Sequence, residues 1–215
     1  MQNIKIKICG ITSVEDAKVV CSFPIHAIGL NFVTRSKRRI TIQLAKNILN
    51  EIPKSIHPVL VFENEEIDRI NHICKLLNVS LVQLHGLESL SYCRNLNKRN
   101  SYLRIIKVFP VKESSMPLLK TYEKVCKSFL LDSSDSKNQM GGTGETADWD
   151  VARKIVSRSK LPVFLAGGLN SKNIIMAIKK VSPYAIDINS GIESSIGKKD
   201  KKLLEKLFIR LAGIK

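Results

Sequence analysis

Short apolar runs recur along the chain, and most are followed by a segment whose apolar residues have helical spacing. The runs are mostly continuous rather than alternating, which is typical of parallel strands whose outer face is covered by helices. Eight runs predict strands, at residues 4–9, 27–32, 57–62, 80–84, 103–109, 128–132, 162–166 and 184–188. The strands begin about every 22 to 35 residues, which is the length of one βα unit.

Helical spacing predicts the segments between the strands and the end of the chain. The clearest helices fall at residues 15–21, 42–51, 66–77, 149–157, 172–181 and 203–211. Ser13, with Asp16 three residues later, has the spacing of a helix start. Asn170 or Ser171 is the expected cap before the apolar face that begins at Ile174. The alternation predicts an α/β fold, a single (β/α)8 TIM barrel with eight parallel strands.

The composition agrees with one domain spanning residues 1–215. The chain is 44% hydrophobic and 25% charged, close to globular averages. It contains no Pro-rich or Gly/Ser-rich stretch that would serve as a linker between two domains. The N-terminal segment begins directly with a strand pattern, MQNIKIKICG, and lacks both a signal-peptide core and a membrane-spanning run. We therefore expect a soluble, cytoplasmic protein.

The five cysteines are odd in number, widely spaced and without a CxxC pair. This pattern argues against a disulfide framework and against a zinc site, and it predicts reduced thiols. The sequence therefore predicts no metal site.

The chain is strongly basic, with 35 Lys and Arg residues against 19 Asp and Glu residues and a formal net charge of +16. Such a charge favours anionic partners in general, including nucleic acid, membranes and phosphorylated metabolites. The basic residues are spread along the chain, and only 6% of the residues are aromatic, unlike the stacking surfaces of single-strand binders. We expect a solvated basic surface, with neither nucleic acid nor membrane as a partner.

Cys9 follows the first predicted strand, in the motif KICGIT. Reactive residues of a (β/α)8 barrel lie at the carboxyl ends of its strands. A thiol at this position is a candidate base or nucleophile if helix amides or a nearby cation lower its pKa. The alternative is a small buried hydrophobe, and position alone does not decide between the two.

Asp132 ends an apolar strand, where an acid is costly unless it is paired, protonated or functional. It is a candidate general acid. The alternative is a cap or turn acid that accepts hydrogen bonds from nearby backbone N–H groups.

Small residues follow the sixth, seventh and eighth predicted strands. Closely spaced glycines let backbone N–H groups converge on an anion, and a helix start adds to the effect. Turn geometry explains each set separately, but three sets together predict a phosphate site. Its expected residues are Gly142, Gly144, Gly167, Gly168, Ser190 and Gly191.

Two further side chains follow predicted strands. Arg38, in TRSKRRIT, offers a planar donor fork for a carboxylate. Its neighbours Arg35, Lys37 and Arg39 are equally basic, so charge alone does not select among them. His85, in VQLHG, is either an acid, base or hydrogen-bond donor or a structural histidine that closes the fourth strand.

Six stretches, taken in order, closely resemble the phosphoribosylanthranilate isomerase family of tryptophan biosynthesis: KICGITSVEDA, SKRRI, VQLHG, LLD with GGTG and DW, LAGGLN, and DINSGIE with GKKD. The resemblance spans nearly the whole chain. It implies a (β/α)8 barrel that converts N-(5-phosphoribosyl)anthranilate into 1-(2-carboxyphenylamino)-1-deoxyribulose 5-phosphate. This Amadori rearrangement requires no metal or cofactor. The expected partner is the substrate itself, a small-molecule phosphosugar.

The resemblance also implies roles for individual residues. Cys9 matches the general base and Asp132 the general acid of the family. Arg38 matches the arginine that faces the anthranilate carboxylate, and His85 and Asp187 are further substrate-binding candidates.

Two positions depart from the family pattern. Glu145 follows GGTG where a Lys or another polar residue is more common, and Asn189 stands in DINSG where a Ser is common. A carboxylate that pointed at a phosphate would be unfavourable, so we expect Glu145 to face solvent.

The oligomeric state stays open, with a monomer favoured.

Two rival functions have distinct requirements. Another phosphosugar barrel, such as a ribulose-phosphate epimerase or a dual-substrate isomerase of histidine biosynthesis, would require metal-binding histidines or a pair of aspartates without a thiol base. A basic binding protein would retain affinity for DNA at about 0.2 M salt, whereas a merely basic surface would lose it.

Overall fold

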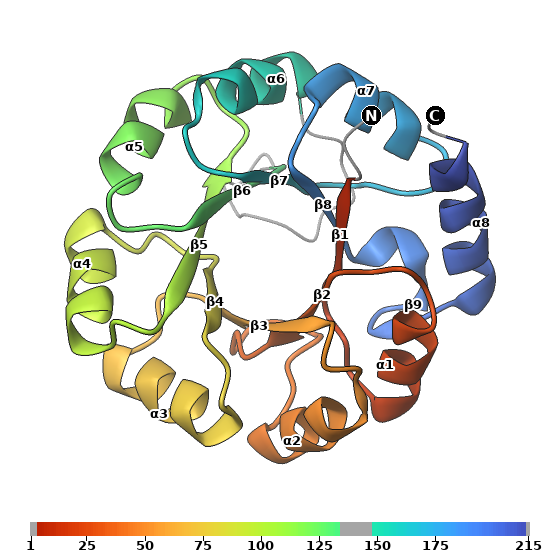
Figure 1. Cartoon of the computed structure of the whole chain (residues 1–215), viewed down its shortest axis with the longest axis horizontal. Helices are drawn as coiled ribbons and strands as arrows, with labels where there is room; N and C mark the ends of the chain where they lie inside the picture. The colour runs from red at the N-terminus through yellow and green to blue at the C-terminus, as the bar shows by residue number, and fades with distance from the viewer. Residues whose placement is uncertain (1–3, 134–147, 214–215) are drawn as a thin grey trace.

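Eight parallel strands close into a barrel in the described part of the chain, and helices surround it (Figure 1). The structure is a computed structural model that describes residues 4–133 and 148–213. The strands are β1 (Lys5–Ile8), β2 (Ala27–Asn31), β3 (His57–Phe62), β4 (Leu81–Leu84), β5 (Arg104–Pro110), β6 (Ser128–Asp132), β7 (Val163–Leu165) and β8 (Ala185–Ile188). The predicted barrel architecture is therefore confirmed.

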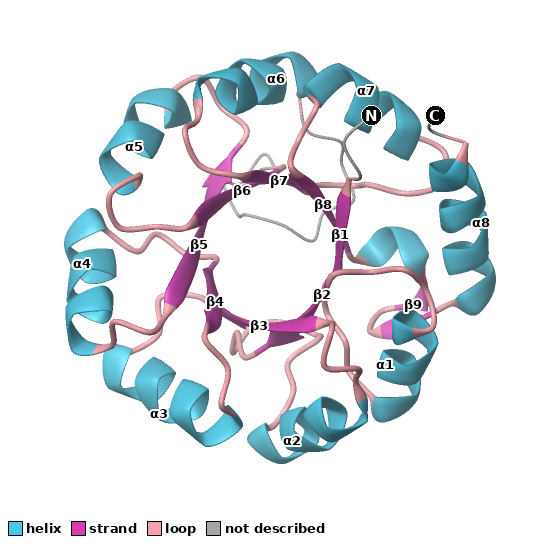
Figure 2. Cartoon of the chain, viewed as in Figure 1, coloured by secondary structure: helices cyan, strands magenta, loops and turns pink. Residues whose placement is uncertain are grey.

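The helices form an outer ring around the strands (Figure 2). They are α1 (Val14–Cys21), α2 (Ile42–Glu51), α3 (Ile67–Leu77), α4 (Leu90–Arg99), α5 (Ser115–Tyr122), α6 (Trp149–Arg158), α7 (Ile174–Val181) and α8 (Lys201–Ala212). None of these described helices combines the length and the apolar character needed to cross a membrane.

Helix α1 shows how the sequence sets a boundary. Ser13 precedes the helix in an extended conformation, and its Oγ accepts a hydrogen bond from the N–H of Asp16 at 3.0 Å. The bond satisfies one of the N–H groups that the first turn leaves without a partner. Ala17 and Val20 on the inner side of the helix are fully buried in the core. The predicted cap at Ser13 is confirmed.

The predicted cap of α7 is wrong by a few residues. The helix begins at Ile174, and the residue before it is Asn173. Asn170 instead stabilises the turn ahead of the helix, where its Oδ1 accepts a hydrogen bond from the N–H of Lys172 at 2.9 Å. Asn170 favours a turn, and the helix therefore begins a few residues later than the sequence predicted.

A short segment between β8 and α8 interrupts the regular pattern and was not predicted. It contains a 3-10 turn, η1 (Ser190–Ile192), and two short antiparallel strands, β9 (Glu193–Ser195) and β10 (Lys198–Lys199). In this hairpin Glu193 lies opposite Lys199.

Polar side chains replace apolar ones inside one part of the barrel. Apolar strand residues, including Val59, Val108 and Leu130, fill another part of the interior. Lys7 and Asp187 are buried strand residues, and they lie opposite each other where β1 pairs with β8. Because paired residues of neighbouring strands point to the same face, the two side chains meet.

Candidate active site

Lys7 and Asp187 form a buried ion pair. Nζ of Lys7 donates a hydrogen bond to Oδ2 of Asp187 at 2.6 Å, and the Lys7 side chain is completely shielded from solvent. Burial alone would lower the pKa of Lys7, but its interactions with Asp187 and Cys9 together outweigh this effect and raise it. The other oxygen of Asp187, Oδ1, is buried and has no hydrogen-bond partner among the described residues. A buried acceptor of this kind is suited to a ligand hydroxyl.

Cys9 follows β1 on the same side as this pair and is 8% exposed. A methyl group at Gly29 of β2 would lie 2.6 Å from the Cys9 Sγ, so this glycine leaves the space that the thiol occupies. Burial raises the pKa of the Cys9 thiol, and the ammonium groups of Lys7 and Lys199 oppose that rise. A thiolate was expected only if a nearby cation lowers the pKa of Cys9, and two such cations are present. Burial nevertheless outweighs their effect on this pKa in the free protein.

Asp132 ends β6 and is 7% exposed. Its Oδ2 lies 3.5 Å from Nε2 of His85. Nδ1 of that imidazole lies 2.9 Å from the side-chain amide nitrogen of Gln83. Because an amide nitrogen only donates, Nδ1 is the acceptor in this contact, and Nε2 faces Asp132.

The loops after β7 and β8 meet at the same end of the barrel. Gly167 has a φ of +88°, a conformation that favours glycine, and a methyl group there would lie 2.7 Å from the Ser133 nitrogen. Gly191 packs so closely on the carbonyl oxygen of Leu169 that a methyl group would clash with it.

These loops also present unused donors. Among the residues that the structure describes, the N–H groups of Gly168, Ser190 and Gly191 have no hydrogen-bond acceptor. Unpaired N–H groups from two adjacent loops are suited to a phosphate. The predicted Gly142 and Gly144, and also Glu145, lie outside the described residues.

Arg38 is separated from its basic neighbours by its environment. Its side chain is 13% exposed, whereas Lys37 and Arg39 are exposed. A methyl group at Gly10, the residue after Cys9, would lie 2.7 Å from Cδ of Arg38. The Arg38 side chain therefore packs against Gly10, and it interacts electrostatically with Cys9.

Glu193 and Lys199 complete this side of the site, and neither was predicted. The carboxylate of Glu193 accepts hydrogen bonds from Arg38 at 2.8 and 2.6 Å and from Lys199 at 2.9 Å. Nζ of Lys199 also donates to Oδ1 of Asn189 at 2.9 Å. Asn189, one of the two residues that depart from the family pattern, thus helps to hold Lys199.

The family model for N-(5'phosphoribosyl)anthranilate (PRA) isomerase matches residues 6–210. The chain belongs to this family. A PRA isomerase from Pelobacter propionicus is 38% identical over 210 residues, which cover 97% of this chain and 95% of the relative. One from Bacillus cereus is 38% identical over 208 residues, covering 96% and 97% of the two chains.

Solved structures of PRA isomerases have the same fold. The enzyme from Thermotoga maritima superposes with a TM-score of 0.87 at 33% identity, covering 98% of this chain and all 100% of the other. A PRA isomerase in complex with reduced 1-(o-carboxyphenylamino)-1-deoxyribulose 5-phosphate gives a TM-score of 0.84 at 32% identity, covering 98% and 100%. This similarity over almost the full length confirms the family resemblance of the six motifs.

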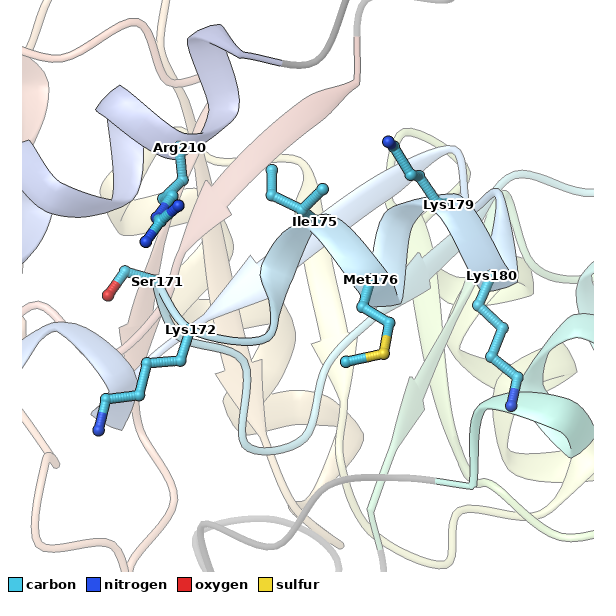
Figure 3. A pocket seen from close by; sticks show the side chains of 7 residues that line it. All are labelled: Ser171, Lys172, Ile175, Met176, Lys179, Lys180 and Arg210. Atoms are coloured by element: carbon cyan, nitrogen blue, oxygen red, sulfur yellow. The ribbon is translucent and has the colours of Figure 1, made fainter.

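A hollow on the outside of this PRA isomerase fold is separate from the site. It has a volume of about 600 Å³ and lies beside α7 and α8. Figure 3 shows the basic side chains of Lys172, Lys179, Lys180 and Arg210 around it. It contains none of the candidate catalytic residues, and Lys180 is already paired with Asp150 at 2.7 Å. We therefore assign it no part in the chemistry.

Proposed function

We propose that this protein isomerises N-(5-phosphoribosyl)anthranilate to 1-(2-carboxyphenylamino)-1-deoxyribulose 5-phosphate in tryptophan biosynthesis. The observation that carries the proposal is one barrel mouth that combines a buried thiol, a buried carboxyl group and backbone donors that have no acceptor among the described residues. Asp187 interacts electrostatically with both Cys9 and Asp132, so the candidate base and acid share one electrostatic environment. The family membership of the chain supports the same reaction.

The first step is opening of the ribose ring. As the anilino nitrogen pushes electrons into C1, the ring oxygen leaves and must receive a proton. Asp132, protonated, delivers this proton and becomes a carboxylate, and the sugar becomes an open-chain iminium. His85, whose Nε2 lies 3.5 Å from Oδ2 of Asp132, stands where it can stabilise the carboxylate.

The second step removes a proton from the sugar. The positive charge of the iminium acidifies the C2 proton, which the Cys9 thiolate takes to form an enolamine. Tautomerisation then gives the ketone product. Lys7 and Lys199 favour the thiolate electrostatically and partly offset the burial that raises the pKa of the Cys9 thiol.

The remaining groups bind the substrate. Oδ1 of Asp187 accepts a hydrogen bond from a sugar hydroxyl, and Arg38 faces the carboxylate of the anthranilate ring. The backbone donors at Gly168, Ser190 and Gly191 bind the 5-phosphate, together with Gly167 and the GGTG loop. Phosphate binding fixes a part of the substrate that does not react, and this positions the sugar between acid and base.

The direct test is a fluorescence assay of the purified protein. Phosphoribosylanthranilate is made fresh from anthranilate by the preceding enzyme of the pathway, and the loss of its fluorescence is followed. Enzyme-dependent loss above the spontaneous rate supports the proposal, and its absence contradicts it.

We further propose that residues 1–215 form a single catalytic domain and that the enzyme is cytoplasmic. All five cysteines are described and carry free thiols, as the sequence predicted. A monomer is the favoured state, although a related PRA isomerase from Thermotoga maritima is dimeric. Light scattering of the purified chain tests the monomer.

The isomerisation should not depend on a metal ion. No group of three or more His, Cys, Asp or Glu side chains in the described part of the chain is arranged to hold one. We expect the same turnover in EDTA as in untreated buffer. Activity lost in EDTA and restored by a divalent cation would contradict this.

The rate should increase with pH near neutrality. Burial raises the pKa of the Cys9 thiol, so only a small fraction of the free enzyme carries the thiolate at neutral pH. Raising the pH increases that fraction, and kcat/KM should rise with it as long as Asp132 keeps the proton that it delivers. A profile of kcat/KM against pH that is the same in Cys9→Ser as in the wild type would count against Cys9 as the base.

A further inference from the structure

Three charged side chains form a network at the rim of the site. Nε and Nη2 of Arg38 donate to Oε1 and Oε2 of Glu193 at 2.8 and 2.6 Å, a bidentate pairing. Nζ of Lys199 donates to Oε1 of Glu193 at 2.9 Å. The side chains of Glu193 and Lys199 are 4% and 0% exposed. An exposed ion pair contributes little, but charged hydrogen bonds shielded from solvent fix geometry strongly.

The backbone holds this network in place. Glu193 lies opposite Lys199 in the β9–β10 hairpin, and the N–H of Lys199 donates to Oδ2 of Asp16 in α1 at 3.1 Å. Nζ of Lys199 also donates to the carbonyl oxygen and to Oδ1 of Asn189, at 3.2 and 2.9 Å. Lys199 is thus bound on several sides, and it fixes the carboxylate that binds Arg38.

The network leaves one edge of the Arg38 guanidinium unused. A guanidinium has five N–H donors in a planar fork, and Glu193 takes the edge formed by Nε and Nη2. Nη1 has no acceptor among the described residues. A second carboxylate can therefore bind the edge formed by Nη1 and Nη2.

The charges agree with a bound carboxylate. Burial alone would raise the pKa of Glu193, but the hydrogen bonds and charges of Arg38 and Lys199 hold it below its usual range. Glu193 is thus an anion between two cations, and the group as a whole carries one excess positive charge. A substrate carboxylate on the free edge neutralises it.

We propose that Glu193, held by Lys199, is a positioning residue that orients Arg38 so that its free edge binds the anthranilate carboxylate. This inference rests on the proposed function. Arg35 makes a similar pairing with Glu63 but is about half exposed, whereas Arg38 is held at 13% exposure beside the site. If Glu193 only stabilised the local structure, its replacement would not affect how strongly the enzyme binds the carboxylate of the anthranilate ring.

The test is the substitution Glu193→Gln. Glutamine keeps the size and one acceptor but removes the charge and the bidentate pairing, so Arg38 loses its fixed orientation. We expect KM for phosphoribosylanthranilate to rise roughly tenfold, the loss of about one good charged hydrogen bond, with a smaller change in kcat. Removal of a negative charge would by itself tighten anion binding, so an unchanged or lower KM overturns the proposal.

A double-mutant cycle shows whether Glu193 acts through Arg38. In an Arg38→Ala background, Glu193→Gln should change KM little, because there is no guanidinium left to orient. Additive effects of the two substitutions overturn the proposal. If wild-type protein lacks turnover, the proposed function fails, whereas additivity in an active enzyme contradicts only the role of Glu193.

Glu113→Gln is the matched control. Glu113 pairs with Lys154 at 2.8 Å on the exposed surface, so this variant should leave KM unchanged. Thermal unfolding checks that each variant folds. If Glu193→Gln does not fold, Glu193→Asp is tested instead, because it keeps the charge but shortens the side chain. The wild-type enzyme should bind the product more tightly than a product analogue that lacks the ring carboxylate. In Glu193→Asp this difference in affinity should be smaller. An unchanged preference in the Asp variant overturns the proposal.

Discussion

Replacing Cys9 with serine should reduce turnover by roughly 10²–10⁴-fold, the usual contribution of a general base. A serine hydroxyl is a far poorer base near neutral pH than a thiol whose ionisation is favoured by Lys7 and Lys199. The fold and phosphate binding should be kept, because serine is slightly smaller and fits the space beside Gly29. Turnover from the fluorescence assay and affinity for the product check the two expectations separately.

Cys21→Ser provides the control for this substitution. Cys21 ends α1, on the outer ring of the barrel, and should tolerate the change without loss of turnover. Near-wild-type turnover in Cys9→Ser would instead assign Cys9 to packing, the alternative that its position at a strand end left open. A loss of product affinity together with turnover would show that the substitution disturbed the site as a whole.

The barrel could be predicted because buried parallel strands are apolar on both faces. Each of the eight predicted strands exists, with ends that differ by one residue at most. The eight predicted βα units imply eight helices, but two of them, α4 and α5, had no residue range assigned from the sequence. In α4 most residues are polar and only Cys93 and Leu96 are buried, and α5 contains Pro117 near its start. Tertiary packing, rather than local preference, stabilises these two segments.

The candidate site was predicted in part. Cys9 and Asp132 stand at strand ends, where their position makes them candidates without deciding their roles. Lys7 was missed because a lysine within a strand is normally exposed, and its partner lies 180 residues away in the chain. Only the pairing of β1 with β8 brings the two side chains together. Pairings between distant segments leave no local signal in a single sequence.

The strongly basic composition also said little about the site. In the described part of the chain, the buried ammonium groups are each matched by a carboxylate: Lys7 by Asp187, Lys107 by Glu88, and Lys199 by Glu193. These pairs follow from the cost of an unpaired buried charge. The excess positive charge is therefore largely a property of the surface. A basic surface of this kind favours anionic molecules in general without selecting among them.

Asp132→Asn should also lower turnover by roughly 10²–10⁴-fold, because the amide cannot deliver a proton to the ring oxygen. Asparagine keeps the size of the side chain and an oxygen that can accept from Nε2 of His85, which lies 3.5 Å away in the wild type. Affinity for the product should therefore change little. Asp150→Asn is the matched control, since Asp150 pairs with Lys180 on the surface and should tolerate the change.

The two roles considered for Asp132 predict opposite results in this variant. An aspartate that only capped the following loop would be replaced well by asparagine, which also caps and turns, and turnover would stay close to that of the wild type. A proton donor, by contrast, loses its function while the binding of substrate and product is retained. Turnover and product affinity must therefore be measured on the same preparation. A large loss of turnover with unchanged product affinity identifies Asp132 as the acid, whereas near-normal turnover would leave the ring-opening step without its proton donor.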